Sequence, residues 1–197
     1  MMLIINICAN DMHYYEFVKP IEDILKKNEV PFDTIHYSKI KVPKNVSNAK
    51  SSSAQKFLGK YHRMIITGTS LKDMSYSKNI GSFSFLKWLD KPVLAICGGM
   101  QMLCMIYGCK LEKNMEIGQM QIDFNAPFLG ISGKREIYAL HNMSIKNNDS
   151  LKKNFKIYSK SSSGCVQAVK SLHHKHFGVL FHPEVRNKDI IENFLRE

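Results

Sequence analysis

The chain has 197 residues, of which 44% are hydrophobic and 23% charged, and a formal net charge of +11. This length can bury a substantial core, and the composition is that of a globular protein rather than a disordered one. No apolar run approaches the ~20 residues of a membrane span, and the N-terminal "MMLIINICAN" lacks the basic residues of a signal peptide.

The first half of the chain alternates predicted strands with predicted helices. Pro20 lies in the first helical segment and predicts a helix start or a kink there. Residues 38–53 are rich in lysine and serine and are predicted to form a loop. Because strands that alternate with helices form parallel sheets covered on both faces, we expect an α/β fold. The predicted strands are residues 3–8, 31–37, 62–68 and 92–97, and the predicted helices are residues 14–28, 83–90 and 99–108.

The pattern changes from about residue 117, where short apolar stretches are joined by turns. These stretches predict an added, partly antiparallel strand region, and residues 188–197 predict a closing helix. We therefore expect a single domain over residues 1–197, with a mostly parallel central sheet and helices on both faces. The predicted strands of this half are residues 117–124, 136–143, 155–162, 165–171 and 177–183.

The five cysteines are odd in number and form no Cys-x-x-Cys pair. This usage favours a reducing compartment over a disulfide framework, so we expect a cytoplasmic protein. They lie at positions 8, 97, 104, 109 and 165.

Cys97 stands between a predicted strand and a predicted helix in "PVLAICGGMQML", residues 92–103. A sharp strand-to-helix turn requires small neighbours, and Ala95 and Gly99 supply them, as in a nucleophile elbow with cysteine in place of serine. The helix that follows favours the thiolate, and the N–H of Gly98 can donate to an oxyanion. The alternative is a buried structural cysteine, for which the flanking glycines have no packing reason.

A thiolate nucleophile needs a base, and His182 in "GVLFHPEV" is the candidate. It ends an apolar strand, and Glu184 two residues later can orient the imidazole and stabilise its charged form. The alternative, a histidine buried in the core, does not explain the carboxylate beside it.

Three further histidines lie close together in "LHHKHF". His173, His174 and His176 could form a metal cluster, but no carboxylate or cysteine is near them in sequence. We therefore interpret the segment as an exposed turn and expect no metal.

The two segments "VLAICGGMQML" and "GVLFHPEV" closely resemble the class I glutamine amidotransferases, whose glutaminase domain uses a Cys–His–Glu triad. Their order and separation are also those of the family. The resemblance implies a flavodoxin-like, three-layer fold in which Cys97 is the nucleophile, His182 the base and Glu184 the orienting acid.

The resemblance also implies an oxyanion hole made of backbone N–H groups. One donor is Gly98, and the other is Thr69 beside Gly68 in "HRMIITGTS". The sequence departs from the family here, because "TGTS" replaces a Gly-Gly-Pro turn. A second, smaller departure is Ala95, where the family has glycine.

Substrate contacts follow from the same resemblance. Gln101 lies one helical turn after Cys97 and is expected to help hold glutamine; the alternative is a structural amide in an apolar helix. Asn142 and Met143 belong to "YALHNMSI", which resembles the segment that receives the amino-acid end of glutamine.

Within the family, the chain is most similar to the stand-alone glutaminase component of the archaeal-type GMP synthase, which is built from two chains. This resemblance implies glutamine as substrate and, as partner, an ATP-pyrophosphatase chain that would use the ammonia to convert XMP to GMP. We expect no cofactor in this chain, since it has neither an S-G-G-x-D-S loop nor a Walker A loop, and ATP and magnesium would belong to the partner. The chain departs from GMP synthases in lacking an aspartate shortly after His141 and in a shorter link after "HPEV".

Positive charge is concentrated near the C-terminus. Residues 134–188 carry eleven Lys and Arg against three Asp and Glu. This surface could meet nucleic acid, a nucleotide or an acidic protein, or be a solvated face. We expect no nucleic acid and no membrane as partner, and we suggest that Lys134, Arg135, Lys146 and Arg186 meet an acidic face of a synthetase.

Two alternatives to the amidotransferase component remain at this point. One is a stand-alone Cys–His hydrolase that cleaves amide or γ-glutamyl bonds without a synthetase. The other is a non-catalytic regulatory or binding protein, which the "TGTS" turn favours and the intact triad disfavours.

Overall fold

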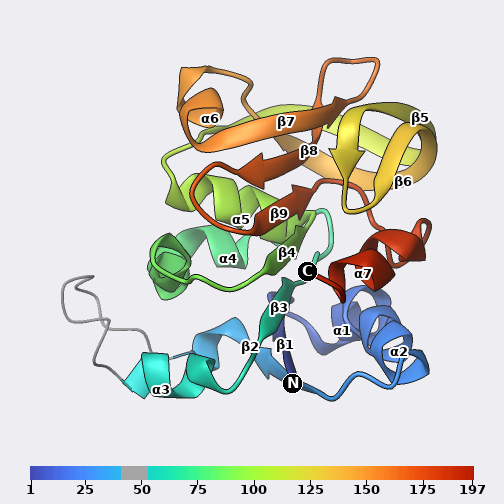
Figure 1. Ribbon diagram of the computed structural model, residues 1–197. Coiled ribbons are helices and arrows are strands. Elements are labelled where there is room, and N and C mark those ends of the chain that lie inside the picture. Colours follow the sequence, from blue (N-terminus) through green and yellow to red (C-terminus); the bar gives the residue numbers. More distant parts are fainter. Residues whose placement is uncertain (41–52) are drawn as a thin grey trace.

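The computed structural model describes residues 1–40 and 53–197, and the described strands form one nine-stranded sheet (Figure 1). The strand order is β2-β1-β3-β4-β9-β8-β7-β5-β6. Pairs from β2 to β9 are parallel, and pairs from β9 to β6 are antiparallel. The predicted α/β fold with an added antiparallel region is confirmed.

The N-terminal half supplies four of the five parallel strands and most of the helices. Most of the predicted loop at 38–53 lies outside the described residues. The elements are β1 (Met2–Asn6), α1 (Asp11–Phe17), α2 (Lys19–Lys27), β2 (Phe32–His36), η1 (Tyr37–Lys39), α3 (Ser53–Gly59), β3 (Arg63–Ile66), α4 (Ser75–Lys78), η3 (Ile80–Lys87), β4 (Val93–Ile96) and α5 (Gly98–Ile106).

The C-terminal half adds a long curled hairpin, β5–β6, and returns to the parallel strands through β9 (Figure 1). The hairpin strands are longer than predicted. They meet in a tight turn in which Leu129 and Gly130 both have positive φ, 44° and 72°, as in a type I′ turn. The elements are β5 (Leu111–Phe128), β6 (Ile131–Ile145), α6 (Asp149–Asn154), β7 (Phe155–Lys160), β8 (Val166–Ser171), β9 (His176–Val179) and α7 (Lys188–Phe194).

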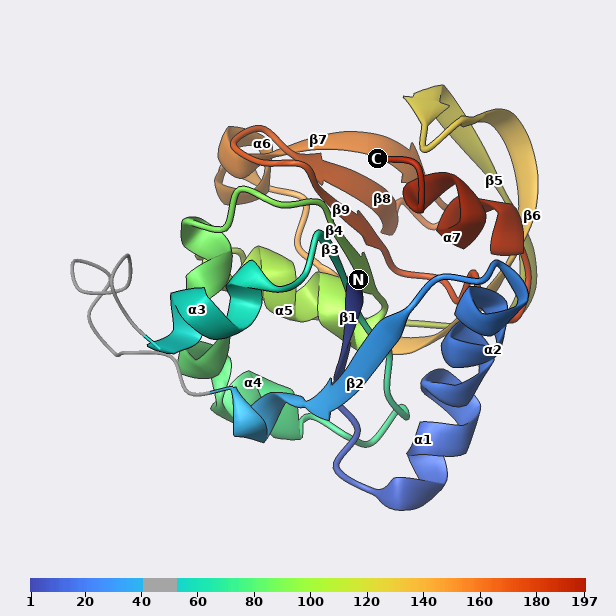
Figure 2. The same ribbon diagram turned by 60° about the horizontal axis from the view of Figure 1, so that its bottom comes forward.

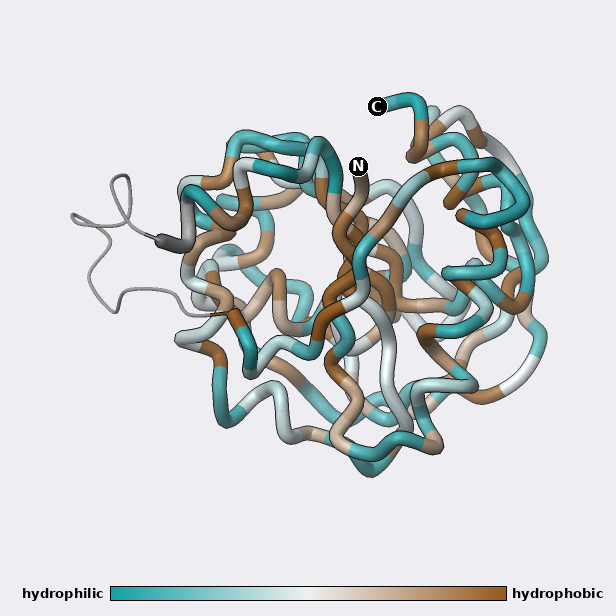
Figure 3. The backbone as a smooth tube through the Cα atoms, turned by 90° about the horizontal axis from the view of Figure 1, so that it is seen from below, coloured by the Kyte–Doolittle hydropathy of each residue, from teal (hydrophilic) through white to brown (hydrophobic). Residues whose placement is uncertain are grey.

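The parallel strands are buried on both faces. Leu3 and Ile5 of β1 pack into one apolar core, whereas Met2 and Ile4 pack into another on the opposite face, because successive side chains of a strand alternate. Figure 2 shows α3, α4 and α5 on one side and α1, α2 and α7 on the other. Figure 3 shows that the chain is most hydrophobic along the central strands.

The predicted helix at residues 14–28 is two helices, α1 and α2, which meet at Val18. Pro20 lies in the first turn of α2, where its missing N–H costs no helical hydrogen bond, so the predicted helix start is confirmed. Among the described residues, no helix is long and apolar enough to span a membrane.

The predicted α-helix at residues 83–90 is wrong in type and position. Residues 80–87 form a 3-10 helix instead. The reason is visible in the spacing of its buried side chains, Phe83, Leu86 and Leu89, because a repeat of three residues matches the turn of a 3-10 helix.

Gly99 generates a prediction about the packing of α5 on β3. A Cβ at this position would lie 2.6 Å from the backbone oxygen of Ile66, so Gly99→Ala must displace the helix or the strand. We expect a loss of about 1–3 kcal/mol in the free energy of unfolding, measured by chemical denaturation. Gly81→Ala is the matched control, because a Cβ there meets nothing within 4 Å; an equal loss in both variants would contradict the account.

Candidate active site

Cys97 occupies a strained turn between β4 and α5. Its backbone has φ 48° and ψ −108°, and it caps the N-terminus of α5. A positive φ costs a non-glycine residue about 1–3 kcal/mol and is typical of functional turns. The N–H of Cys97 donates to Val179 at 2.8 Å, so hydrogen bonding to β9 continues into the turn. The structure therefore has the predicted elbow.

The glycines after Cys97 do have packing roles, which corrects the expectation from sequence. Gly99 lies against the carbonyl of Ile66. A Cβ on Gly98 would lie 3.0 Å from Cδ1 of Ile7 and 3.3 Å from the ring of Tyr76. These glycines let α5 approach the sheet closely, and Gly98 remains at the first turn of the helix, where backbone N–H groups have no helical partner.

His182 and Glu184 follow β9, the strand that pairs with β4. The backbone N–H of His182 donates to Tyr138 of β6 at 2.9 Å. Nδ1 of His182 lies 2.7 Å from Oε1 of Glu184, and both side chains are almost completely buried. The carboxylate therefore fixes the ring, with Nδ1–H directed to Glu184, as predicted.

The surroundings of His182 favour its charged form. Burial lowers its pKa, but Glu184 and Cys97 together raise the pKa well above its usual value. Nε2 of His182 is buried and has no hydrogen-bond partner among the described residues. A Cβ on Gly68 would lie 2.8 Å from Cε1 of His182 and 3.3 Å from Cβ of Cys97. Gly68 is thus the small residue that lets thiol and imidazole approach from opposite strands.

A pocket opens beside the thiol, whose Sγ lies 3.6 Å from the carbonyl of Leu140. The residues that line it come from the turn after β3, from the start of α5 and from β6. They include Thr69, Asp73, Tyr76, Cys97, Gly98, Gln101, Leu140, His141 and Asn142. Both predicted oxyanion donors, Thr69 and Gly98, therefore share one pocket with the nucleophile.

The predicted substrate residues are linked to one another. Gln101 is buried, its Oε1 accepts from the hydroxyl of Tyr76, and its Nε2 donates to the carbonyl of Met143 at 2.8 Å. Asn142 donates to the carbonyl of Leu71 at 2.8 Å. Gln101 and Asn142 line the pocket, but these side-chain groups already have partners, so their contact with glutamine remains a prediction.

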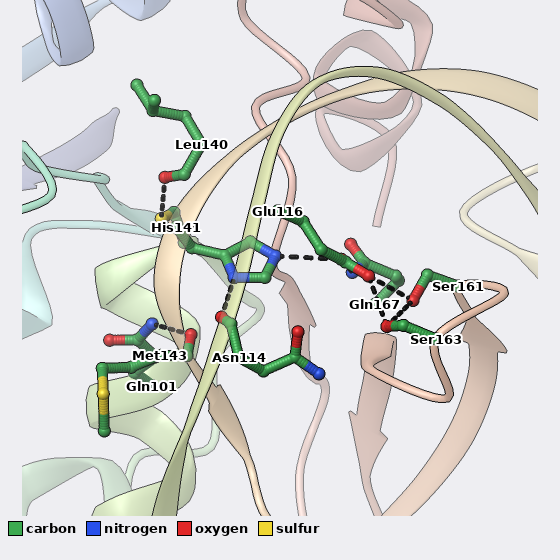
Figure 4. A network of polar contacts seen from close by, with 10 residues as sticks. Gln101, Asn114, Glu116, Leu140, His141, Met143, Ser161, Ser163 and Gln167 are labelled. Atoms are coloured by element: carbon green, nitrogen blue, oxygen red, sulfur yellow. Dashed lines mark hydrogen bonds and ion pairs between the residues drawn. The ribbon is translucent and has the colours of Figure 1, made fainter.

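A buried polar network, which the sequence analysis missed, lies behind the pocket (Figure 4). Nε2 of His141 lies 3.2 Å from Oε2 of Glu116, and Nδ1 lies 3.2 Å from the carbonyl of Asn114. The ring is satisfied on both sides only when doubly protonated, although burial lowers its pKa. The available signal was a histidine and a glutamate at alternating, otherwise apolar strand positions.

This network contains residue types that bind metals. Donor atoms of Glu116, His141 and Cys165 lie within 4.8 Å of one another. However, Oε1 of Glu116 already accepts from Ser161 and Ser163, and Oε2 from Gln167 and His141. The carboxylate thus fits a closed hydrogen-bond network better than an open set of ligands.

The three histidines of "LHHKHF" contact three separate acceptors. Nε2 of His173 lies 3.2 Å from Oδ1 of Asn154, and Nε2 of His174 lies 3.1 Å from the carbonyl of Lys87. His176 is fully buried in β9. The interpretation as an exposed turn is therefore wrong for His176, because its ring packs inward and its Nε2 contacts the carbonyl of Leu89.

Known proteins share this sequence pattern. The family model "Glutamine amidotransferase class-I" matches residues 17–197. The glutaminase-type chain of the glutamine-hydrolysing GMP synthase of Methanobrevibacter smithii, named as one subunit of that enzyme, is 28% identical over 57% of this chain and 63% of its own length. GMP synthase of Lactobacillus gasseri is 32% identical over 54% of this chain, but only 22% of its own length. The matches thus span less than two thirds of these curated relatives.

Solved structures agree in fold. A protein from Thermoplasma acidophilum, described as a GMP synthase subunit, has a TM-score of 0.78 at 18% identity, covering 100% of this chain and 93% of that one. The glutaminase domain of Trypanosoma brucei CTPS has a TM-score of 0.72 at 14% identity, covering 100% and 92%. Since the family model spans nearly all of the sequence and the expected fold is present, the chain belongs to the class I glutamine amidotransferase family.

Proposed function

We propose that this chain hydrolyses glutamine through Cys97 and supplies the ammonia to a synthetase that aminates XMP to GMP. The observation that carries the proposal is the buried His182–Glu184 pair, which lies beside a cysteine in a strained elbow. Such an arrangement is suited to attack by a thiolate and to proton delivery by an imidazolium.

The reaction follows from these positions. His182 holds the proton of the Cys97 thiol, and the thiolate attacks the side-chain amide carbon of glutamine. The backbone N–H groups of Gly98 and Thr69 stabilise the oxyanion of the tetrahedral intermediate. His182 then gives its proton to the leaving nitrogen, so that ammonia departs and a γ-glutamyl thioester remains on Cys97. Water hydrolyses the thioester to glutamate, with His182 acting as the base.

Two observations support a protein partner for the ammonia. The relative from Methanobrevibacter smithii is named as one subunit of GMP synthase, which implies a second polypeptide. In addition, Met115 and Ile117 of β5 are 69% and 54% exposed, and Met115 lines a depression together with Asn142, next to the catalytic pocket. Exposed apolar side chains at such a rim favour docking of another protein.

The predicted basic contacts to that partner need revision. Arg186 pairs with Glu136, and Arg135 lies 3.8 Å from Asp189. These two arginines therefore have acidic partners within the chain, which leaves Lys134 and Lys146 as the proposed contacts to a synthetase.

The first prediction concerns the nucleophile. Ammonia release from glutamine is measured with the purified chain alone, and then with the pyrophosphatase chain of a GMP synthase, ATP, magnesium and XMP. We expect activity that is present or stimulated with the partner, and that Cys97→Ala reduces by at least about 10⁴-fold. Cys109→Ala, at the far end of α5, is the control and keeps the activity.

Two outcomes would count against the proposal. Activity with glutamine that the partner leaves unchanged would indicate a free-standing hydrolase or a different synthetase. No activity under either condition would contradict glutamine hydrolysis itself.

The second prediction concerns pH. Because Glu184 raises the pKa of His182, the imidazolium persists above the usual histidine range, and activity falls only as pH rises through this elevated pKa. Glu184→Gln removes the charge, so the alkaline limb of kcat/KM should move to lower pH by about 1–3 units. The maximal rate should fall by about 10²–10⁴-fold.

The control for this experiment is Glu112→Gln, which removes the same charge from an exposed site on β5. It should leave the pH profile unchanged. A profile of Glu184→Gln that coincides with wild type would show that Glu184 does not set the protonation of His182.

A further inference from the structure

The turn that carries the second oxyanion donor has no regular secondary structure. Thr69 lies between the end of β3 at Ile66 and the short helix α4, which begins at Ser75. It lines the pocket together with Cys97 and Gly98. Since neither a helix nor a strand fixes the N–H of Thr69, its direction depends on the side chains that hold the turn.

Asp73 is the side chain with most contacts to this turn. Its Oδ2 accepts from the hydroxyl of Thr69 at 2.6 Å and from the N–H of Ala9, after β1, at 2.7 Å. Its Oδ1 accepts from the hydroxyl of Ser75 at 2.6 Å and from the N–H of Ser75 at 3.1 Å. One carboxylate therefore connects the turn to the sheet on one side and to α4 on the other.

The carboxylate is suited to this role because it stays charged. Burial raises the pKa of Asp73, but the hydrogen bonds from Ser75, Thr69 and Ala9 outweigh burial and lower the pKa below its usual value. Hydrogen bonds to a charged acceptor are about twice as strong as neutral ones. Each oxygen already accepts two hydrogen bonds, so the charge is directed into the turn rather than offered to a ligand.

Two neighbouring contacts hold the same turn at other points. The thiol of Cys8 donates to the carbonyl of Gly68 at 3.5 Å, and Asn142 donates to the carbonyl of Leu71 at 2.8 Å. The N–H of Asp73 itself donates to the carbonyl of Ser70 at 3.0 Å. The turn is thus fixed residue by residue around Thr69, and Asp73 supplies the contact at Thr69 itself.

We propose that Asp73 is a positioning residue for the oxyanion hole, which aims the backbone N–H of Thr69 by holding its side chain. In this chain, the carboxylate replaces the rigidity that a Gly-Gly-Pro turn would provide. The proposal rests on the proposed glutamine hydrolysis. It also explains how "TGTS" is compatible with catalysis.

The test compares Asp73→Ala and Asp73→Asn with Lys72→Ala, an exposed neighbour in the same turn that does not line the pocket. Because an oxyanion donor acts in the transition state, Asp73→Ala should lower kcat by about 10–10²-fold, somewhat less than the loss of a donor itself, with KM changed little. Asp73→Asn, which keeps the shape and one acceptor, should lie between this variant and wild type. Lys72→Ala should match wild type.

Two further measurements separate positioning from general damage. Alkylation of Cys97 by iodoacetamide passes through no oxyanion, so its rate should be the same in wild type and Asp73→Ala. Thr69→Ser keeps the hydroxyl and should keep most of kcat, whereas Thr69→Val should lose it as Asp73→Ala does. An increase in KM alone would instead make Asp73 a substrate contact, and equal losses of alkylation and hydrolysis would make it a residue of general stability; either result overturns the proposal.

Amide hydrogen exchange over residues 67–74 decides the structural part without any activity. Exchange should accelerate in Asp73→Ala and not in Lys72→Ala, and unchanged exchange would overturn the proposal. If the wild-type chain fails to hydrolyse glutamine with or without a synthetase, the proposed function fails, while the exchange result still shows whether Asp73 holds the turn.

Discussion

The backbone of Cys97 is the constraint on which the active site depends. A residue with φ 48° at the end of a strand is unfavourable by itself, so its surroundings must hold it. β4 lies between β3 and β9, and Gly99 lets α5 pack directly against the carbonyl of Ile66. The thiol is therefore presented at the carboxyl edge of the sheet, where the chain after β9 brings His182.

The two sides of the pocket are built in different ways. The elbow and the His182–Glu184 pair stand on neighbouring strands of the central sheet, and their geometry depends on the fold as a whole. The turn from residue 67 to residue 73 is held by side-chain hydrogen bonds from Asp73, Asn142 and Cys8. Substitutions on the first side should disturb folding together with catalysis, whereas those on the second side should change catalysis selectively.

Much of this arrangement could be predicted from the sequence, because local patterns carry it. The alternation of apolar strands and helices indicated the parallel sheet, and the small residues around Cys97 predicted the elbow. What could not be predicted depends on contacts between distant segments. Asp73 contacts Ala9, and His141 contacts Glu116, and spacing does not reveal which polar residues meet across a fold. The 3-10 helix at 80–87 was missed because its three-residue repeat resembles a helical one over so short a segment.

The central claim is that Cys97 carries a γ-glutamyl thioester during turnover. It is tested most directly by mixing the enzyme and its synthetase partner with glutamine, quenching rapidly in acid and locating adducts by tandem mass spectrometry. The account predicts a γ-glutamyl adduct on Cys97 and on no other cysteine, absent in Cys97→Ala. An adduct on a different cysteine, or ammonia release with no adduct on Cys97, would contradict it.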